Sequence, residues 1–180
     1  ANLPLAEEKK QKFSTVMDYT VRNVFVASDD ITKADISANT VSVDCYVGVS
    51  TNPAGNPLPD EANPTKSYDF TIPDNRLITN NGLYGKPLSG AVREFGVYNT
   101  SGTRIDNSFN APVAITIPFT DKDNDGIVDG SNPSVRVKTL RIYWLDETRN
   151  VWVRLPNSAL DKTAKTVSAP VKHFSVYALD

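Results

Sequence analysis

The 180-residue sequence contains one cysteine and one histidine. A single cysteine excludes a framework of internal disulfides. Cys45 shares one face of a predicted strand with Val43 and Val47, so we interpret it as a core residue. No stretch approaches the ~20 consecutive apolar residues of a membrane-spanning helix, so we expect a chain that does not itself span a membrane. The net charge of −2 gives no electrostatic reason to expect binding to nucleic acid.

Most of the chain has the pattern of short β-strands. Apolar and polar residues alternate in short runs, and segments rich in Gly, Pro, Asn and Asp separate these runs. The series predicts a mainly β fold, an antiparallel β-sandwich, rather than βαβ units. The predicted strands are Arg22–Ala27, Thr40–Gly48, Ser67–Ile72, Ala91–Tyr98, Pro112–Phe119, Val135–Trp144, Val151–Leu155, Thr166–Val171 and Val176–Leu179.

One helix is expected, near the N-terminus, from Leu5 to about Thr20. Phe13, Val16 and Met17 recur there at three- and four-residue spacing behind a charged first turn.

The sequence also divides near residue 66. Residues 51–66 contain four prolines and no apolar periodicity, which predicts a long surface loop or a joint between subdomains. We therefore expect residues 1–66 to form a helix-bearing N-terminal part and residues 67–180 to form the main sandwich.

Four aspartates lie close together in the sequence DKDNDGIVD of residues 121–129. They occupy positions 1, 3, 5 and 9 of a D-x-D-x-D-G loop, and Gly126 stands at position 6, where the backbone turns sharply. Alternate residues around such a turn direct their oxygens inward, and Ca²⁺ takes six to eight oxygen ligands. The sequence therefore predicts a Ca²⁺ site. Its predicted ligands are the carboxylates of Asp121, Asp123, Asp125 and Asp129 and the backbone carbonyl of Ile127.

The loop differs from an EF-hand, because Asn132 stands at position 12 and Pro133 blocks a following helix. It resembles instead the Ca²⁺ loops of dockerins, thrombospondin type 3 repeats and bacterial surface proteins. That resemblance implies an extracellular, cell-surface or periplasmic module in which the ion has a structural role. The alternative is an acidic, solvent-exposed turn that binds no metal.

The only histidine lies near the C-terminus, in the run His173-Phe174-Ser175. The ordinary pKa of histidine suits a general base at neutral pH, and Ser175 offers a hydroxyl nucleophile two residues away. The pair suggests a catalytic site. The alternative is that Phe174 is a core residue and that His173 packs at the turn of a closing hairpin between the strands Thr166–Val171 and Val176–Leu179.

Four segments of the C-terminal half carry a recognisable motif: Leu140–Glu147, Val151–Val153, Thr166–Ala169 and His173–Leu179. Together they resemble the proteolysis-site motif of GAIN domains, which occur in adhesion receptors and polycystin-like proteins. The tripeptide His-Phe-Ser also resembles the self-cleavage site of domains shared by ankyrins, netrin receptors and death-domain scaffolds. The cysteines that cross-link these strands in the vertebrate motif are missing here.

The resemblance implies that the chain cuts itself between Phe174 and Ser175. His173 would take the proton of the Ser175 hydroxyl, which attacks the carbonyl carbon of Phe174, and the resulting ester would hydrolyse. Domains of this shape also occur that keep the fold without cutting.

Trp144 and Trp152 raise a third possibility, a platform on which sugar rings stack. They fall on neighbouring strands of an expected hairpin, where aromatic pairs commonly stabilise the sheet. From the sequence we thus expect an extracytoplasmic, calcium-binding module with a structural or adhesive role in a cell-surface protein or assembly, where it meets a protein partner. The alternatives are an autoproteolytic processing module and a carbohydrate-binding module.

Overall fold

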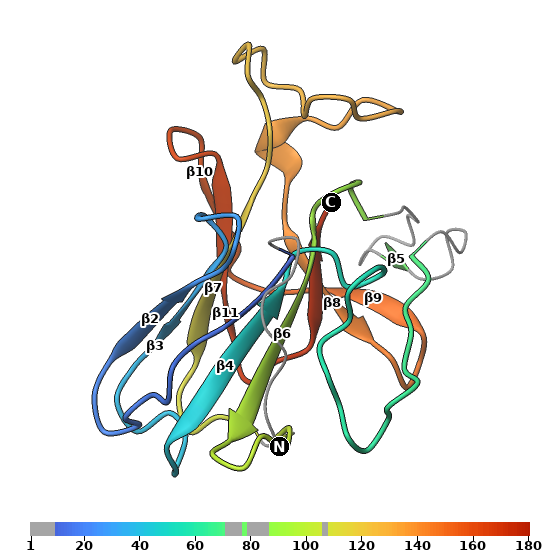
Figure 1. Cartoon of the computed structure of the whole chain (residues 1–180). Helices are drawn as coiled ribbons and strands as arrows, with labels where there is room; N and C mark the ends of the chain where they lie inside the picture. Colours follow the sequence, from blue (N-terminus) through green and yellow to red (C-terminus); the bar gives the residue numbers. More distant parts are fainter. Residues whose placement is uncertain (1–9, 71–76, 79–86, 106–107) are drawn as a thin grey trace.

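The computed structural model describes residues 10–70, 77–78, 87–105 and 108–180, which form two β-sheets (Figure 1). The larger sheet has seven strands, in the spatial order β1 (Gln11–Phe13), β4 (Cys45–Ser50), β6 (Val92–Asn99), β12 (Val176–Leu179), β8 (Ile142–Asp146), β9 (Val151–Arg154) and β5 (Leu77–Ile78). The smaller sheet has five, in the order β10 (Ala159–Asp161), β11 (Thr166–Val171), β7 (Val113–Pro118), β3 (Lys33–Ile36) and β2 (Asn23–Val26). The described part also contains one 3₁₀ turn, η2 (Val137–Thr139).

Neighbouring strands pair antiparallel, except for β5 and β9, which pair parallel. The main core lies between the two sheets. The larger sheet contributes Val47, Val49 and Phe95, and the smaller sheet contributes Ile115 and Ile117, all of them without exposed surface. Alternate residues of each strand therefore face the opposite sheet, as in a β-sandwich. The predicted mainly β, antiparallel fold is confirmed.

The outer face of the larger sheet is also covered. A second apolar cluster, formed by Tyr143, Leu145, Trp152, Val176 and Ala178, packs beneath Tyr68 and Phe70. The covering side chains belong to the irregular segment 51–70, drawn in teal to green beside β6, β8 and β9 in Figure 1. Because the central strands are buried on both faces, all four residues of β12 are buried.

The predicted N-terminal helix is wrong for the residues described from residue 10 on; its residues 5–9 lie outside the described part. Residues 11–13 form β1, which pairs antiparallel with β4, and Met17 makes an isolated bridge to Cys45. Val16, which belonged to the predicted helical stripe, is 45% exposed. The spacing of three and four residues was outweighed by the backbone hydrogen bonds that the edge of β4 offers.

Strands from both sides of residue 66 share the same sheets, since β4 pairs with β6 and β3 pairs with β7. The two strands around His173-Phe174-Ser175 lie in different sheets, because β11 belongs to the smaller sheet and β12 to the larger. This segment therefore crosses between the sheets instead of closing a hairpin. Cys45 is a buried core residue, as predicted, and burial together with the charge of Asp44 raises the pKa of its thiol.

Candidate functional site

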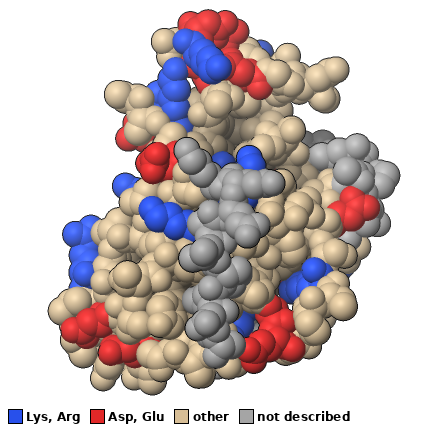
Figure 2. All heavy atoms as spheres, in the orientation of Figure 1, with Lys and Arg blue, Asp and Glu red and all other residues tan. Residues whose placement is uncertain are grey.

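The aspartate loop projects from one end of the sandwich. It lies in the chain between β7 and η2, drawn in gold at the top of Figure 1. In the same view, acidic side chains gather at the end of this projection (Figure 2). The loop is anchored to neighbouring backbone by a hydrogen bond from the Val128 N–H to the Val135 carbonyl (2.9 Å) and by one from Val137 N–H to the Gly126 carbonyl (2.9 Å).

Three of the predicted carboxylates come together. Asp121, Asp123 and Asp129 each offer an oxygen, and these oxygens lie within 4.8 Å of one another. Asp125 is outside this group, and its carboxylate accepts a hydrogen bond from the Ile127 N–H (2.8 Å). The fold thus assembles three of the four predicted acidic ligands.

Backbone donors shape the turn around the first aspartate. Asp121 is buried and its carboxylate accepts hydrogen bonds from the N–H groups of Asp125 (3.1 Å) and Gly126 (3.1 Å). Gly126 has φ +80°, a left-handed conformation that a side chain would strain. Lys165 donates its ammonium to the backbone carbonyl of Asp121, which ties the loop to the neighbouring β10–β11 connection.

The carboxylates of Asp121 and Asp123 influence each other. Burial acts to raise the pKa of Asp121, but the Gly126 and Asp125 N–H donors outweigh it and the pKa is lowered. The Asp125 N–H acts to lower the pKa of Asp123, but desolvation and the charges of Asp125 and Asp121 raise it overall. The charges of the neighbouring aspartates contribute to the raised pKa of Asp123, and a bound cation would act in the opposite direction.

The three carboxylates are close enough together that they could hold one metal ion. Two oxygens that bind the same Ca²⁺ at ~2.3–2.6 Å lie at most about 5 Å apart. The 4.8 Å limit among the three carboxylate oxygens meets this requirement. Hard oxygen donors are the ligands that Ca²⁺ prefers, and the loop offers no histidine or cysteine ligand.

The His-Phe-Ser segment packs against the core. The His173 ring lies against Trp144 (ring centroids 5.0 Å apart, planes at 67°), and the Phe174 ring contacts Phe95 (5.5 Å) and Phe109 (4.9 Å). The Tyr177 hydroxyl donates to the His173 carbonyl. In the described part of the chain, no hydrogen bond joins the His173 ring to the Ser175 hydroxyl. The two side chains nevertheless line the same cavity.

The two tryptophans do not form one platform. Trp144 lies opposite Val153 and Trp152 opposite Leu145, so the indole rings project from opposite faces of the larger sheet. Trp152 is 1% exposed beneath Phe70 and cannot contact a ligand. Trp144 is half-buried and lines the cavity beside His173. The predicted hairpin of β8 and β9 is confirmed, and only one tryptophan is open to a ligand.

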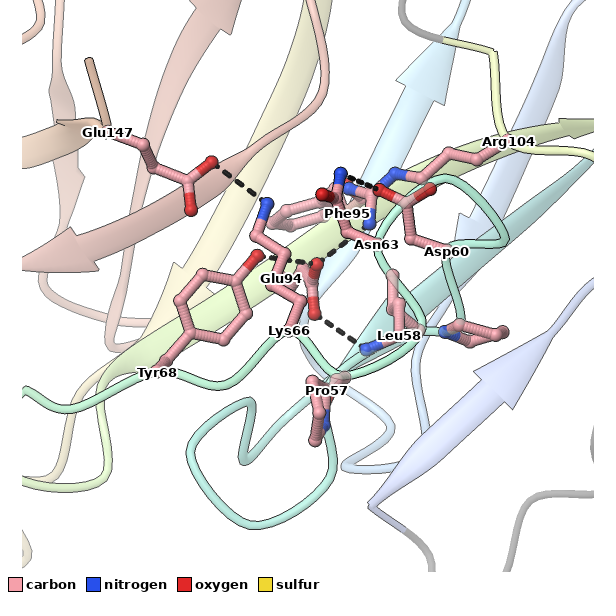
Figure 3. A network of polar contacts seen from close by, with 12 residues as sticks. Pro57, Leu58, Asp60, Asn63, Lys66, Tyr68, Glu94, Phe95, Arg104 and Glu147 are labelled. Atoms are coloured by element: carbon pink, nitrogen blue, oxygen red, sulfur yellow. Dashed lines mark hydrogen bonds and ion pairs between the residues drawn. The ribbon is translucent and has the colours of Figure 1, made fainter.

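One buried polar network, centred on Glu94, was not predicted from the sequence. Glu94 is fully buried on β6, and its carboxylate accepts hydrogen bonds from the Leu58 N–H (2.7 Å), the Tyr68 hydroxyl (3.0 Å) and Arg104 (2.9 Å) (Figure 3). Burial raises the pKa of the Tyr68 hydroxyl, and the charge of Glu94 adds to the effect. The presence of Glu94 within the predicted strand 91–98 was the available signal, since a buried charge requires a partner.

Protein families and curated proteins were compared with the chain. No protein-family model matches the chain, and no curated protein matches it significantly. The resemblances to GAIN domains and to dockerin-type loops therefore stay predictions from short motifs.

Among the described residues, no helix is long and apolar enough to cross a membrane.

Proposed function

We propose that this chain is a calcium-binding β-sandwich module with a structural or adhesive role in an extracytoplasmic, cell-surface protein or assembly. The observation that carries the proposal is the convergence of Asp121, Asp123 and Asp129, whose oxygens lie within 4.8 Å of one another. Of the predicted ligands, these are the first, second and last aspartates, so the ion would join the beginning of the loop to its end.

A bound Ca²⁺ would supply charge neutralisation and a rigid cross-link. Asp121 lies three residues after the end of β7 at Pro118, and Asp129 donates its N–H to the Thr120 carbonyl (2.8 Å). The Asp129 carboxylate also accepts the Lys122 N–H (3.0 Å). These contacts already draw the loop ends together, and a cation held by Asp121, Asp123 and Asp129, with Asp125 and the Ile127 carbonyl as further predicted ligands, would fix them.

A loop fixed in this way supports a role in contact with a protein partner. It projects beyond both sheets (Figure 1), so its conformation governs the surface at that end of the module. Extracellular modules commonly bind Ca²⁺ at ~10⁻⁴–10⁻³ M. At such affinities, the free Ca²⁺ of the surroundings would decide whether the surface is rigid.

The test compares thermal unfolding in EDTA and in millimolar Ca²⁺ for three proteins: the wild type, Asp123→Asn and Asp30→Asn. The amide introduced by Asp123→Asn would keep an oxygen for the Asp125 N–H (3.3 Å) but lose the charge that a cation needs. Asp30 is exposed and lies outside the loop, so its substitution removes the same charge as a matched control.

In ~10 mM Ca²⁺, which is ~10–100 times a Kd of ~10⁻³–10⁻⁴ M, binding stabilises the folded state by about 1.4–2.7 kcal/mol. For a chain of this size that corresponds to a rise in Tm of roughly 3–10 °C. We expect this rise in the wild type and in Asp30→Asn, and a much smaller one in Asp123→Asn. An equal Tm in EDTA and Ca²⁺ for the wild type would contradict the proposal.

The geometry gives less support to self-cleavage. The imidazole of His173 packs on Trp144 instead of hydrogen bonding to the Ser175 hydroxyl. Neither Phe174 nor Ser175 has a positive φ, so the bond between them carries no strain of that kind. We therefore propose the structural role and treat cleavage as the competing hypothesis.

A further inference from the structure

A cavity of about 470 Å³ opens where three distant parts of the chain meet at the larger sheet. One wall comes from residues 60–68, another from the end of β8 and the start of the β8–β9 turn at residues 144–148, and the third from the crossover at residues 173–175. No residue of the aspartate loop lines it. Whatever this cavity binds is therefore independent of the calcium proposal.

Arg104, which lines the cavity, is held by hydrogen bonds to the sheet. The Arg104 side chain is 7% exposed and donates to Glu94 (2.9 Å), whose side chain is 1% exposed. Arg104 also donates to the Phe95 carbonyl (3.1 Å). These bonds fix the guanidinium and join the wall at residues 60–68 to the sheet through Tyr68, as Figure 3 shows. Pre-organisation of this kind is typical of small-molecule sites.

An ion pair connects two of the cavity walls. Lys66 donates to Glu147 (3.0 Å), so residues 60–68 are tied to the β8–β9 turn. The Lys66 ammonium also lies 5.3 Å from the centre of the Tyr68 ring. The rim is therefore held by an ion pair between segments 81 residues apart in the sequence.

The other two walls contribute aromatic rings, Trp144 from the end of β8 and His173 from the crossover. Trp144 is half-buried, with His173 packed edge-on against it and Tyr177 behind the imidazole (ring centroids 6.5 Å). This packing fixes the orientation of both rings while part of the indole borders the cavity. An indole surface of this kind accepts the C–H groups of an apolar ring face.

The charges at the cavity are largely balanced. The described residues that line the cavity include one lysine, Lys66, and one arginine, Arg104. Each of the two pairs with a carboxylate. Of two further acids, Asp146 pairs with Arg149 (2.8 Å), and Asp60 accepts a hydrogen bond from the Ala62 N–H (3.0 Å). Because both of these cations are already paired, and because many hydrogen-bonding groups lie beside an aromatic ring, the chemistry suits an uncharged ligand rich in hydroxyl groups.

We propose that this cavity binds a neutral saccharide. One sugar ring lies with its C–H face on Trp144, and its hydroxyls exchange hydrogen bonds with Asp60, Asn63 and His173. The volume is within the range of ~300–1,000 Å³ that small-molecule sites have. His173 then acts as a binding residue, which gives the single histidine a role that requires no cleavage.

The experiment uses the whole chain and a panel of neutral oligosaccharides: β-glucan, xylan, mannan, chitin and α-glucan fragments at millimolar concentration. Binding is measured by calorimetry and by tryptophan fluorescence. We expect at least one of these sugars to bind, with equal affinity in Ca²⁺ and in EDTA. Asp60→Asn and His173→Ala should each weaken its binding several-fold, and Trp144→Ala at least ten-fold.

The two tryptophans provide matched controls. The fluorescence change on sugar addition should vanish in Trp144→Phe and persist in Trp152→Phe, because Trp152 lies on the other face of the sheet. Circular dichroism checks that each variant is folded. Three results would overturn the proposal. They are no binding to any member of the panel, an unchanged affinity for the sugar in folded Trp144→Ala, or peptides that bind at the same residues more tightly than any sugar of the panel and displace it. If the wild type binds a sugar but binds no Ca²⁺, that result would contradict only the calcium proposal.

Discussion

Glu94 is the most deeply buried charged group among the described residues, and its substitution gives a quantitative test of how the segment 57–68 is held on the sheet. Its carboxylate accepts three hydrogen bonds, from the Leu58 N–H (2.7 Å), the Tyr68 hydroxyl (3.0 Å) and Arg104 (2.9 Å). Glu94→Gln keeps the shape of the side chain but replaces one carboxylate oxygen by an NH₂ group. The NH₂ group would then face a group that is itself a hydrogen-bond donor, such as the Leu58 N–H or Arg104.

The magnitude follows from burial. Glu94 and Arg104 have side chains that are 1% and 7% exposed, so water does not compensate for a lost contact. Removing one partner of a buried ion pair costs about 3–5 kcal/mol. We expect Glu94→Gln to lower the free energy of unfolding by about that amount, which corresponds to a fall in Tm of roughly 6–20 °C for a chain of this size.

The control is a second glutamate of the same network. Glu147 pairs with Lys66, but their side chains are 41% and 29% exposed. Because water screens an exposed pair, Glu147→Gln should cost less than about 1 kcal/mol. Both variants are measured by urea unfolding, and amide hydrogen exchange at Leu58 reports the local contact. Equal and small effects of the two substitutions, with unchanged exchange at Leu58, would refute the argument that burial makes Glu94 decisive.

Two further predictions concern the C-terminal region. Burial raises the pKa of Asp180 from 3.8 to about 6, so the folded state keeps the proton to a higher pH than the unfolded state does. The stability of the wild type relative to Asp180→Asn should therefore fall as the pH rises from 3.8 to 6. Tm measured across that interval for both proteins checks this, and a constant difference would contradict it. We also expect the purified chain to keep one full-length mass during prolonged incubation at neutral pH, as the control variant Ser175→Ala should. Two fragments that join at the Phe174–Ser175 bond in the wild type alone would instead establish self-cleavage.

The strands that can be predicted from the sequence are those with a strong alternation between two environments. β7 and β11 coincide closely with the predicted runs 112–119 and 166–171 because their apolar residues face the core and their polar residues face outward. β1, β3 and β10 were missed; they are three or four residues long, and segments this short carry little periodic signal. The run 135–144 was predicted as one strand, but η2 interrupts it before β8 begins at Ile142.

The candidate sites show the same division. The aspartate loop could be located because its ligands are local in the sequence, within nine residues. The cavity could not, because its wall at residues 60–68 is separated in the sequence from the other two walls, by 81 residues between Lys66 and Glu147 and by more than 100 residues to the crossover at 173–175. Trp144 and Trp152 looked equivalent in the sequence, yet the register of β8 and β9 places one in the cavity and buries the other.

By itself, the sequence determined the mainly β class, the buried cysteine and the position of a turn rich in carboxylates. These properties depend on residues within a few positions of one another, where alternation and ligand spacing are visible directly. Only the tertiary structure decided that the N-terminal residues extend the sheet, that the His-Phe-Ser segment crosses between sheets, and that Glu94 and Arg104 hold a cavity beside Trp144. Those outcomes depend on which backbone edges and charged groups meet after folding, and the free energy of such contacts is set by partners that are distant in the chain.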